Sequence, residues 1–203
     1  MVDSPTLRSI CVYCGSSDGG DPRYGEAADE MGRAIAEAGL GLVYGGGSLG
    51  LMGRVAHAAM AAGGTVTGII PEFLHEREVM LREVSDLVVT DDMHERKRIM
   101  FERSDAFIAL PGGIGTLEEV IEMMTWSQLG RHDKPIALIN VANFWDPLDD
   151  LLRHMLAAGF IRNASDVEYD VLPSVADAIP ALTRRHSELA ASRTPRKTLL
   201  DRL

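Results

Sequence analysis

The stretch Ala106-Phe107-Ile108-Ala109-Leu110-Pro111-Gly112-Gly113-Ile114-Gly115-Thr116 decides the fold of this 203-residue chain. It begins as an apolar run with the length of a buried strand and then passes through a glycine-rich turn. A long helical pattern of apolar residues follows directly, at positions 116–129. A buried strand that runs through glycines into a helix is typical of the βα units of a parallel sheet.

The rest of the chain repeats this alternation of strand and helix. Parallel strands joined by right-handed crossover helices are the expected arrangement, with helices on both faces of the sheet. The sequence therefore predicts a single doubly wound, Rossmann-like α/β domain over residues 1–190 and a short tail at 191–203. The expected strands are 7–13, 41–44, 65–70, 87–90, 106–110 and 135–141, and the expected helices are 24–38, 51–62, 93–103, 116–129, 147–158 and 174–189.

Composition and charge argue against several classes of protein. The formal net charge is −10, which disfavours a nucleic-acid binder because such affinity rests on Lys and Arg meeting phosphates. A local cationic pocket for a small anion is compatible with that charge. No apolar run approaches the roughly 20 residues of a membrane span, and the N-terminal residues lack the pattern of a signal peptide. We therefore expect a cytoplasmic protein that binds neither nucleic acid nor membrane.

The two cysteines, Cys11 and Cys14, have the C-x-x-C spacing that supports redox chemistry or metal binding in other proteins. Here they lie in and just after the first expected strand, where residues three apart point to opposite faces. A structural zinc site needs four ligands, and the chain has no second cysteine pair. We expect two buried cysteines and no metal site.

A second glycine-rich turn, Gly45-Gly46-Gly47-Ser48-Leu49-Gly50, matches G-x-G-x-x-G between a strand and a helix. Such a turn lets a phosphate approach the backbone and the N–H groups at the helix start. A dinucleotide site is disfavoured because the motif falls in the second βα unit, and the acidic residue about 20 positions on would be Glu72, in a loop. We favour a phosphate cradle of another kind, with tight turning and close packing as the alternative.

The turn at residues 111–116 is the stronger signal, because two such turns in one small domain are hard to explain by packing alone. Thr116 is expected as the N-cap of the helix that follows. The exposed N–H groups of residues 113–116, together with the helix dipole, would then bind a phosphate.

Two charged residues near these turns each allow two interpretations. Glu119 completes a T-x-x-E capping box with Thr116, and its carboxylate either reaches back to the helix start or lies at the ligand site. Arg96 belongs to the cationic cluster His94-Glu95-Arg96-Lys97-Arg98. It either lies on a solvated helix face or points at the ligand, where Arg makes bidentate contacts to phosphate or carboxylate. The residue pattern alone leaves both questions open.

Together these motifs resemble those of the "lonely guy" family, which are cytokinin riboside 5′-monophosphate phosphoribohydrolases long labelled lysine decarboxylases. The resemblance covers residues 8–185. It rests on Cys14-Gly15-Ser16-Ser17, Gly45-Gly46-Gly47-Ser48-Leu49-Gly50-Leu51-Met52-Gly53, Met93-His94-Glu95-Arg96-Lys97, Pro111-Gly112-Gly113-Ile114-Gly115-Thr116-Leu117-Glu118-Glu119 and Thr125-Trp126-Ser127-Gln128-Leu129-Gly130.

The resemblance implies that Arg96 and Glu119 are the catalytic pair. The implied substrate is a nucleoside 5′-monophosphate, often with an N6-isoprenoid adenine, and the products are the free base and ribose 5-phosphate. It also implies a homodimer, or a hexamer in some members, and we expect no metal or redox cofactor. The implied substrate contacts are Ser16, Gly46, Glu78, Lys97, Gly113, Ile114, Gly115, Thr116, Leu117, Glu118 and Thr125.

Two other functions are weighed against this one. A decarboxylase of the usual type would need a lysine that holds pyridoxal phosphate. Of the three lysines, Lys197 is in the tail, Lys134 precedes a strand at the wrong end of the sheet, and only Lys97 is near the site. A non-catalytic nucleotide carrier or sensor could use the same glycine turns, but it would not need an Arg96–Glu119 pair. The motifs do not select between N6-modified and plain adenine.

Overall fold

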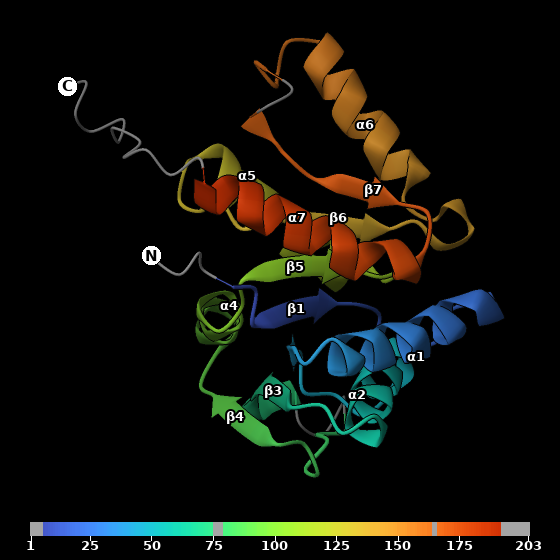
Figure 1. The fold of residues 1–203 in the computed structure, drawn as a ribbon. Helices are drawn as coiled ribbons and strands as arrows, with labels where there is room; N and C mark the ends of the chain where they lie inside the picture. Colours follow the sequence, from blue (N-terminus) through green and yellow to red (C-terminus); the bar gives the residue numbers. More distant parts are fainter. Residues whose placement is uncertain (1–5, 75–78, 164–165, 192–203) are drawn as a thin grey trace.

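A parallel sheet of seven strands forms the centre of the molecule (Figure 1). The computed structural model describes residues 6–74, 79–163 and 166–191. The strands stand in the order β4-β3-β2-β1-β5-β6-β7, which confirms the predicted doubly wound α/β fold. They are β1 (Ser9–Tyr13), β2 (Gly41–Tyr44), β3 (Val66–Pro71), β4 (Asp86–Thr90), β5 (Ala106–Ala109), β6 (Ile136–Ile139) and β7 (Asp170–Leu172).

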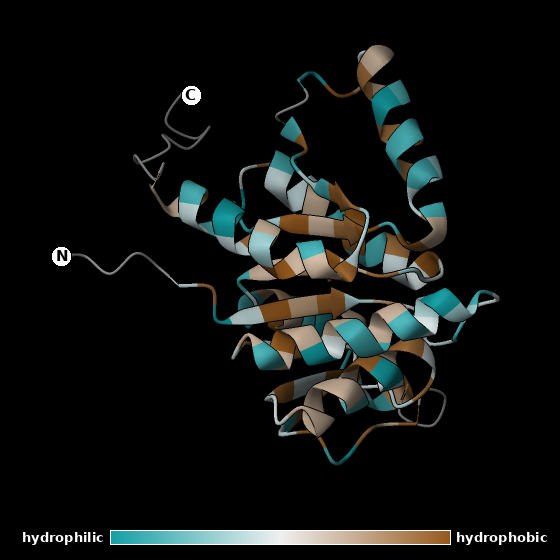
Figure 2. Ribbon diagram, turned by 45° about the vertical axis from the view of Figure 1, so that its right-hand side comes forward, coloured by the Kyte–Doolittle hydropathy of each residue, from teal (hydrophilic) through white to brown (hydrophobic). Residues whose placement is uncertain are grey.

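Helices cover both faces of this sheet (Figure 1). Apolar side chains of α1, α2 and α7 pack in one core layer, and those of α4, α5 and α6 pack in the other. The brown strands lie between helices that turn teal, hydrophilic residues outward (Figure 2). The helices are α1 (Pro22–Glu37), α2 (Gly50–Ala61), α4 (Met93–Glu102), α5 (Ile114–Gln128), α6 (Asp146–Ala157) and α7 (Ala178–Ala191).

Strand β1 contributes side chains to both core layers, because successive side chains of a strand point to opposite faces of the sheet. Ile10 and Val12 face α1 and α2, whereas Cys11 and Tyr13 face α4 and α5. Cys14 follows on the first side, so the two cysteines lie in different layers. Both are buried, as the sequence predicted, and neither forms a disulfide.

The boundaries of the elements differ from the predictions at a few points. The short strand β7 was not predicted, because only Val171 and Leu172 among its three residues are apolar. Helix α5 begins at Ile114 rather than at residue 116, and this difference matters for the site. Of the tail predicted at 191–203, only Ala191 belongs to the described residues, as the end of α7. Within the described residues, no helix combines the length and apolarity needed to cross a membrane.

The strand order brings the glycine-rich turns to one edge of the sheet. From β1 the chain moves outward to β2, β3 and β4, and α4 then carries it back to β5 on the other side of β1. The loops that follow β1 and β5 therefore lead away in opposite directions. Ligands of doubly wound folds bind at such a point, outside the carboxyl ends of the strands.

Candidate active site

A cavity of about 350 Å³ lies at this carboxyl edge, where the loops after β1 and β5 meet the starts of α2, α4 and α5. Two further cavities, of about 330 and 430 Å³, lie beside β6 and β7 and contain none of the predicted site residues. The first cavity is lined by Cys14, Gly15, Ser16, Met52, Leu74, Met93, Arg96, Gly113, Ile114, Gly115, Thr116, Glu118 and Glu119.

The peptide groups of Gly15 join the three loops. The Gly15 N–H donates to the carbonyl of Pro111 (3.1 Å), and the Gly15 carbonyl accepts from the N–H of Met52 (3.2 Å). Gly50, at the start of α2, has a φ of +58°, and a Cβ there would lie 2.3 Å from the backbone nitrogen of Ser17. Helix α2 therefore starts directly against the loop after β1, which only glycine permits at this point.

The start of α5 faces the cavity and has no side-chain cap. Its cap residue is Gly113, which makes no side-chain hydrogen bond to the helix, so the prediction of Thr116 as N-cap is wrong. Thr116 instead lies within the first turn, with its Oγ1 packed over Gly112. N–H groups of a first turn have no partner inside their own helix. Those of Ile114, Gly115 and Thr116 lie in cavity-lining residues, at the positive end of the α5 dipole.

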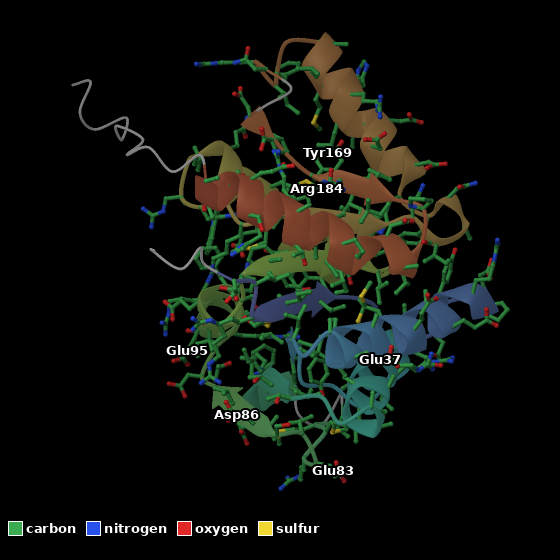
Figure 3. All side chains as sticks on the ribbon, in the orientation of Figure 1. Glu37, Glu83, Asp86, Glu95, Tyr169 and Arg184 are labelled. Atoms are coloured by element: carbon green, nitrogen blue, oxygen red, sulfur yellow. The ribbon has the colours of Figure 1, made fainter. Side chains whose placement is uncertain are left out.

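Arg96 is buried at the cavity rather than solvated on the helix surface, with an exposed fraction of 5%. Its Nη2 donates to the carbonyl of Gly45 (3.2 Å), and its Nη1 contacts the sulfur of Met93. Its Nε has no hydrogen-bond partner among the described residues. Glu95, the preceding residue, lies on the outer side of α4 (Figure 3). A buried guanidinium with an unused donor favours an anionic ligand.

Glu119 is buried on the inward face of α5 and also lines the cavity. A capping box would require Thr116 at the N-cap, so that interpretation of Glu119 is wrong. The charges of Glu119 and Arg96 both act on the Cys11 thiol. Burial and the Glu119 carboxylate hold the pKa of Cys11 well above its ordinary value, whereas Arg96 lowers it. Burial, Cys11 and Glu119 likewise raise the pKa of Tyr13. The two opposite charges thus share the α4 and α5 side of β1.

Most of the predicted site residues meet at the cavity, and these are Ser16, Arg96, Gly113, Ile114, Gly115, Thr116, Glu118 and Glu119. Gly46, Lys97 and Leu117 are not among the lining residues. Gly46 has a φ of +79° and packs against Ile69 and Ile70 of β3, so its contacts are structural. Lys97 is ion-paired with two glutamates of α5.

Two further predicted contacts are Thr125 and Glu78, and Thr125 is also not among the lining residues. Thr125 is exposed about three turns along α5 from Ile114, and its hydroxyl donates to the carbonyl of Ile121 (2.7 Å). Glu78 lies outside the described residues.

The structure also adds residues that the sequence did not single out. Met52, Leu74 and Met93 supply an apolar wall, and a pocket wall of this kind has no sequence pattern of its own. Gly45 had a usable signal, since it opens the glycine-rich turn after β2. A Cβ at Gly45 would lie 2.2 Å from Nη2 of Arg96. Only a residue without a side chain therefore leaves room for the guanidinium at this point.

The arrangement combines a helix start without a side-chain cap, an apolar wall, a buried cation and a buried carboxylate. The described residues hold no group of three or more His, Cys, Asp or Glu side chains placed to bind a metal ion. Fold and site together define a Rossmann-like protein with a cavity at the carboxyl edge of its sheet, lined by groups that suit an anionic organic ligand.

Comparison with known proteins gives the family. Residues 52–182 match the family described as "possible lysine decarboxylase", and the chain belongs to this family. The cytokinin riboside 5′-monophosphate phosphoribohydrolase of Rhodococcoides fascians is 46% identical over 88% of this chain and 90% of its own. The protein of the same name, LOG1, from Arabidopsis thaliana is 41% identical over 93% of this chain and 90% of its own.

Solved structures share the fold at lower identity. The molybdenum cofactor carrier protein of Chlamydomonas reinhardtii is 25% identical, with a TM-score of 0.65 and coverage of 88% of this chain and 98% of its own. The molybdenum cofactor binding protein of Rippkaea orientalis is 27% identical, with a TM-score of 0.64 and coverage of 88% and 96%. The fold therefore serves proteins whose names describe binding as well as proteins whose names describe hydrolysis.

The glycines of the turn before α5 are expected to respond differently to alanine. A Cβ on Gly112 would lie 2.2 Å from Oγ1 of Thr116, whereas a Cβ on Gly115 meets nothing within 4 Å. Gly112→Ala should lower the free energy of unfolding by about 1–3 kcal/mol, the usual cost of overpacking. Gly115→Ala, inside the first turn of α5, should leave it unchanged or raise it by up to about 1 kcal/mol.

Urea unfolding of both variants measures this difference. Gly115→Ala is the matched control for Gly112→Ala, because the two changes add the same methyl group to the same turn. Equal stability of the two variants would contradict the assignment of Gly112 to packing and of Gly115 to the open cavity.

Proposed function

We propose that this chain hydrolyses the N-glycosidic bond of adenosine 5′-monophosphates, including N6-modified forms, and releases the free base and ribose 5-phosphate. The observation that carries the proposal is one cavity that holds an uncapped helix start together with buried Arg96 and Glu119. Relatives 41–46% identical to this chain are named cytokinin riboside 5′-monophosphate phosphoribohydrolases, which supports the same reaction.

The phosphate would bind at the start of α5. The N–H groups of Ile114, Gly115 and Thr116 lack helical partners, and the helix dipole adds about half a positive charge at this end. Ser16, from the loop after β1, lines the same cavity and supplies a hydroxyl donor. The adenine would lie against the apolar side chains of Met52 and Met93.

The reaction needs a negative charge close to the ribose. Cleavage of an N-glycosidic bond builds positive charge on the sugar, as in other glycoside hydrolyses. The buried Glu119 carboxylate would stabilise that charge and orient the attacking water. Arg96 would position the nucleotide with its unused Nε donor and assist the departing base. Held by Gly45, this guanidinium needs no rearrangement during the reaction.

A non-catalytic carrier is the second candidate, since structural neighbours at 25–27% identity are named molybdenum cofactor carrier or binding proteins. The anion site alone would serve such a function. A carrier has no use for a buried carboxylate beside its anion, which would repel the ligand. Glu119 therefore favours hydrolysis.

We also propose that the chain forms a homodimer through α5. One side of this helix, away from Glu119, carries a stripe of exposed or half-buried residues that are all apolar except Thr125. Ile114 and Leu129, at its two ends, are 82% and 69% exposed. Thr125 lies on the same stripe, so a second copy packed there would take this predicted site residue out of solvent. The stripe consists of Ile114, Leu117, Ile121, Thr125 and Leu129.

The first prediction under this function is a requirement for the 5′-phosphate. Release of adenine, measured by chromatography, should be rapid from AMP and absent from adenosine, because only AMP occupies the start of α5. The N6-isopentenyl derivative of AMP tests the base in the same assay. Equal turnover of adenosine and AMP would contradict the proposed anion site.

The second prediction concerns the charge of Glu119. Glu119→Gln keeps the shape of the side chain but cannot stabilise a positive sugar, so turnover should fall by about a hundredfold or more. Arg96→Ala should also lower turnover while folding is retained. Arg98→Ala is the matched control, because Arg98 lies on the same helix with its side chain 55% exposed. Near-normal turnover in a folded Glu119→Gln variant would contradict the catalytic role of Glu119. It would not contradict the proposed phosphate site.

The third prediction concerns association. Light scattering at micromolar concentration should give the mass of a dimer, and Ile121→Glu with Leu129→Glu should give a monomer, because charges then oppose across the interface. Phe160→Glu, at a residue 84% exposed and away from α5, should remain dimeric. A monomeric wild type would refute the dimer, and a monomeric Phe160→Glu variant would refute its placement on α5.

A further inference from the structure

An ionic bridge joins α4 to α5 beside the catalytic pair. Lys97 follows Arg96 on α4, and Glu122 lies one turn beyond Glu119 on α5. The Nζ of Lys97 is 3.0 Å from Oε1 of Glu122 and 2.6 Å from Oε1 of Glu118. The bridge therefore connects the two helical turns that carry Arg96 and Glu119.

The inner half of this bridge is shielded from solvent. The side chains of Lys97 and Glu122 are only 12% and 23% exposed, whereas that of Glu118 is half exposed. Oε2 of Glu122 is buried without a hydrogen-bond partner among the described residues, so this carboxylate depends on Lys97. Burial alone would lower the pKa of Lys97, but its hydrogen bonds to Glu118 and Glu122 outweigh that effect and raise it. Lys97 thus remains charged at neutral pH.

This bridge differs from the ordinary surface pairs of the chain. Arg98 on the same helix pairs with Glu95 and Glu102, all of them more than one-third exposed, where solvent screens the attraction. Those pairs stabilise a single helix. The Lys97 bridge links two separate helices, one before and one after β5 in the chain, and each helix supplies one member of the proposed catalytic pair.

We propose, on the basis of the proposed function, that Lys97 and Glu122 are positioning residues for the hydrolysis. Their ion pair holds the Glu119 turn of α5 against the Arg96 turn of α4 at the separation that the reaction requires. Lys97 acts in this role through Arg96 and Glu119 rather than by contact with the substrate, in agreement with its absence from the cavity lining. A displacement of about 1 Å at a reacting group can cost a hundredfold in rate, so a bridge of this kind has a large effect on turnover.

The test uses the full chain and AMP as substrate. Lys97→Met should lower kcat by about ten- to a hundredfold and leave KM within about threefold, because the phosphate site at the start of α5 is untouched. Arg98→Met, one residue further along α4, is the control and should keep the wild-type kcat. A kcat of Lys97→Met equal to that of the wild type would overturn the inference.

A second variant separates positioning from folding. Lys97→Met alone leaves the Glu122 carboxylate buried without compensation, so Tm should also fall. Lys97→Met with Glu122→Met removes both charges and should restore Tm to near the wild-type value while kcat stays low. A double variant that regains both Tm and kcat would overturn the positioning role. A wild type that releases no adenine from AMP would overturn the proposed function and this inference together, whereas an active wild type with an unaffected Lys97→Met variant would overturn the inference alone.

Discussion

The hydrogen bonds of the Gly15 peptide groups are the constraint on which the rest of the site depends. A doubly wound sheet sends the loops after β1 and β5 in opposite directions, and Gly15 ties them together through the Pro111 carbonyl. The same residue accepts from Met52 and so holds α2 against the loop. A side chain at Gly15 would lie 3.1 Å from the carbonyl oxygen of Ser17, tighter than ordinary packing. The cavity exists because three turns meet at this small residue.

The site carries groups that a stability-optimised protein would satisfy or avoid. Arg96 is a buried cation with an unused Nε–H, and the N-cap of α5 is Gly113, which gives the first turn of the helix no side-chain acceptor. Unpaired buried donors cost folding free energy. In the proposed function, an anionic ligand would satisfy the guanidinium and the helix start together, and the folding free energy lost in the free protein would be regained on binding. Because the donors are fixed before the ligand arrives, they need little reorganisation to stabilise charge.

Three sides of helix α5 make different contacts. Its inward face packs Val120, Met123 and Met124 against the sheet, and Glu119 lies on that face near the cavity. Its outer stripe is exposed at both ends, at Ile114 and Leu129, and is the surface of the proposed dimer. The third side carries Glu122, which reaches Lys97 of α4.

The sequence by itself determined the layers of the molecule and the edge at which the site lies. Strand–helix alternation predicts a parallel doubly wound sheet, and parallel strands bring glycine turns from residues 15, 45 and 111 to one edge whatever the detailed packing. Local pattern could not decide the role of Glu119, because T-x-x-E describes a capping box and a catalytic turn equally well. The decision came from where α5 begins, at Ile114, and that depends on Thr116 packing over Gly112. In the same way, Arg96 belongs to a cationic run that suits a solvated helix, and only the crossover of α4 past Gly45 buries it. Gly45 lies 51 positions from Arg96 in the chain, and a single sequence does not show such a contact.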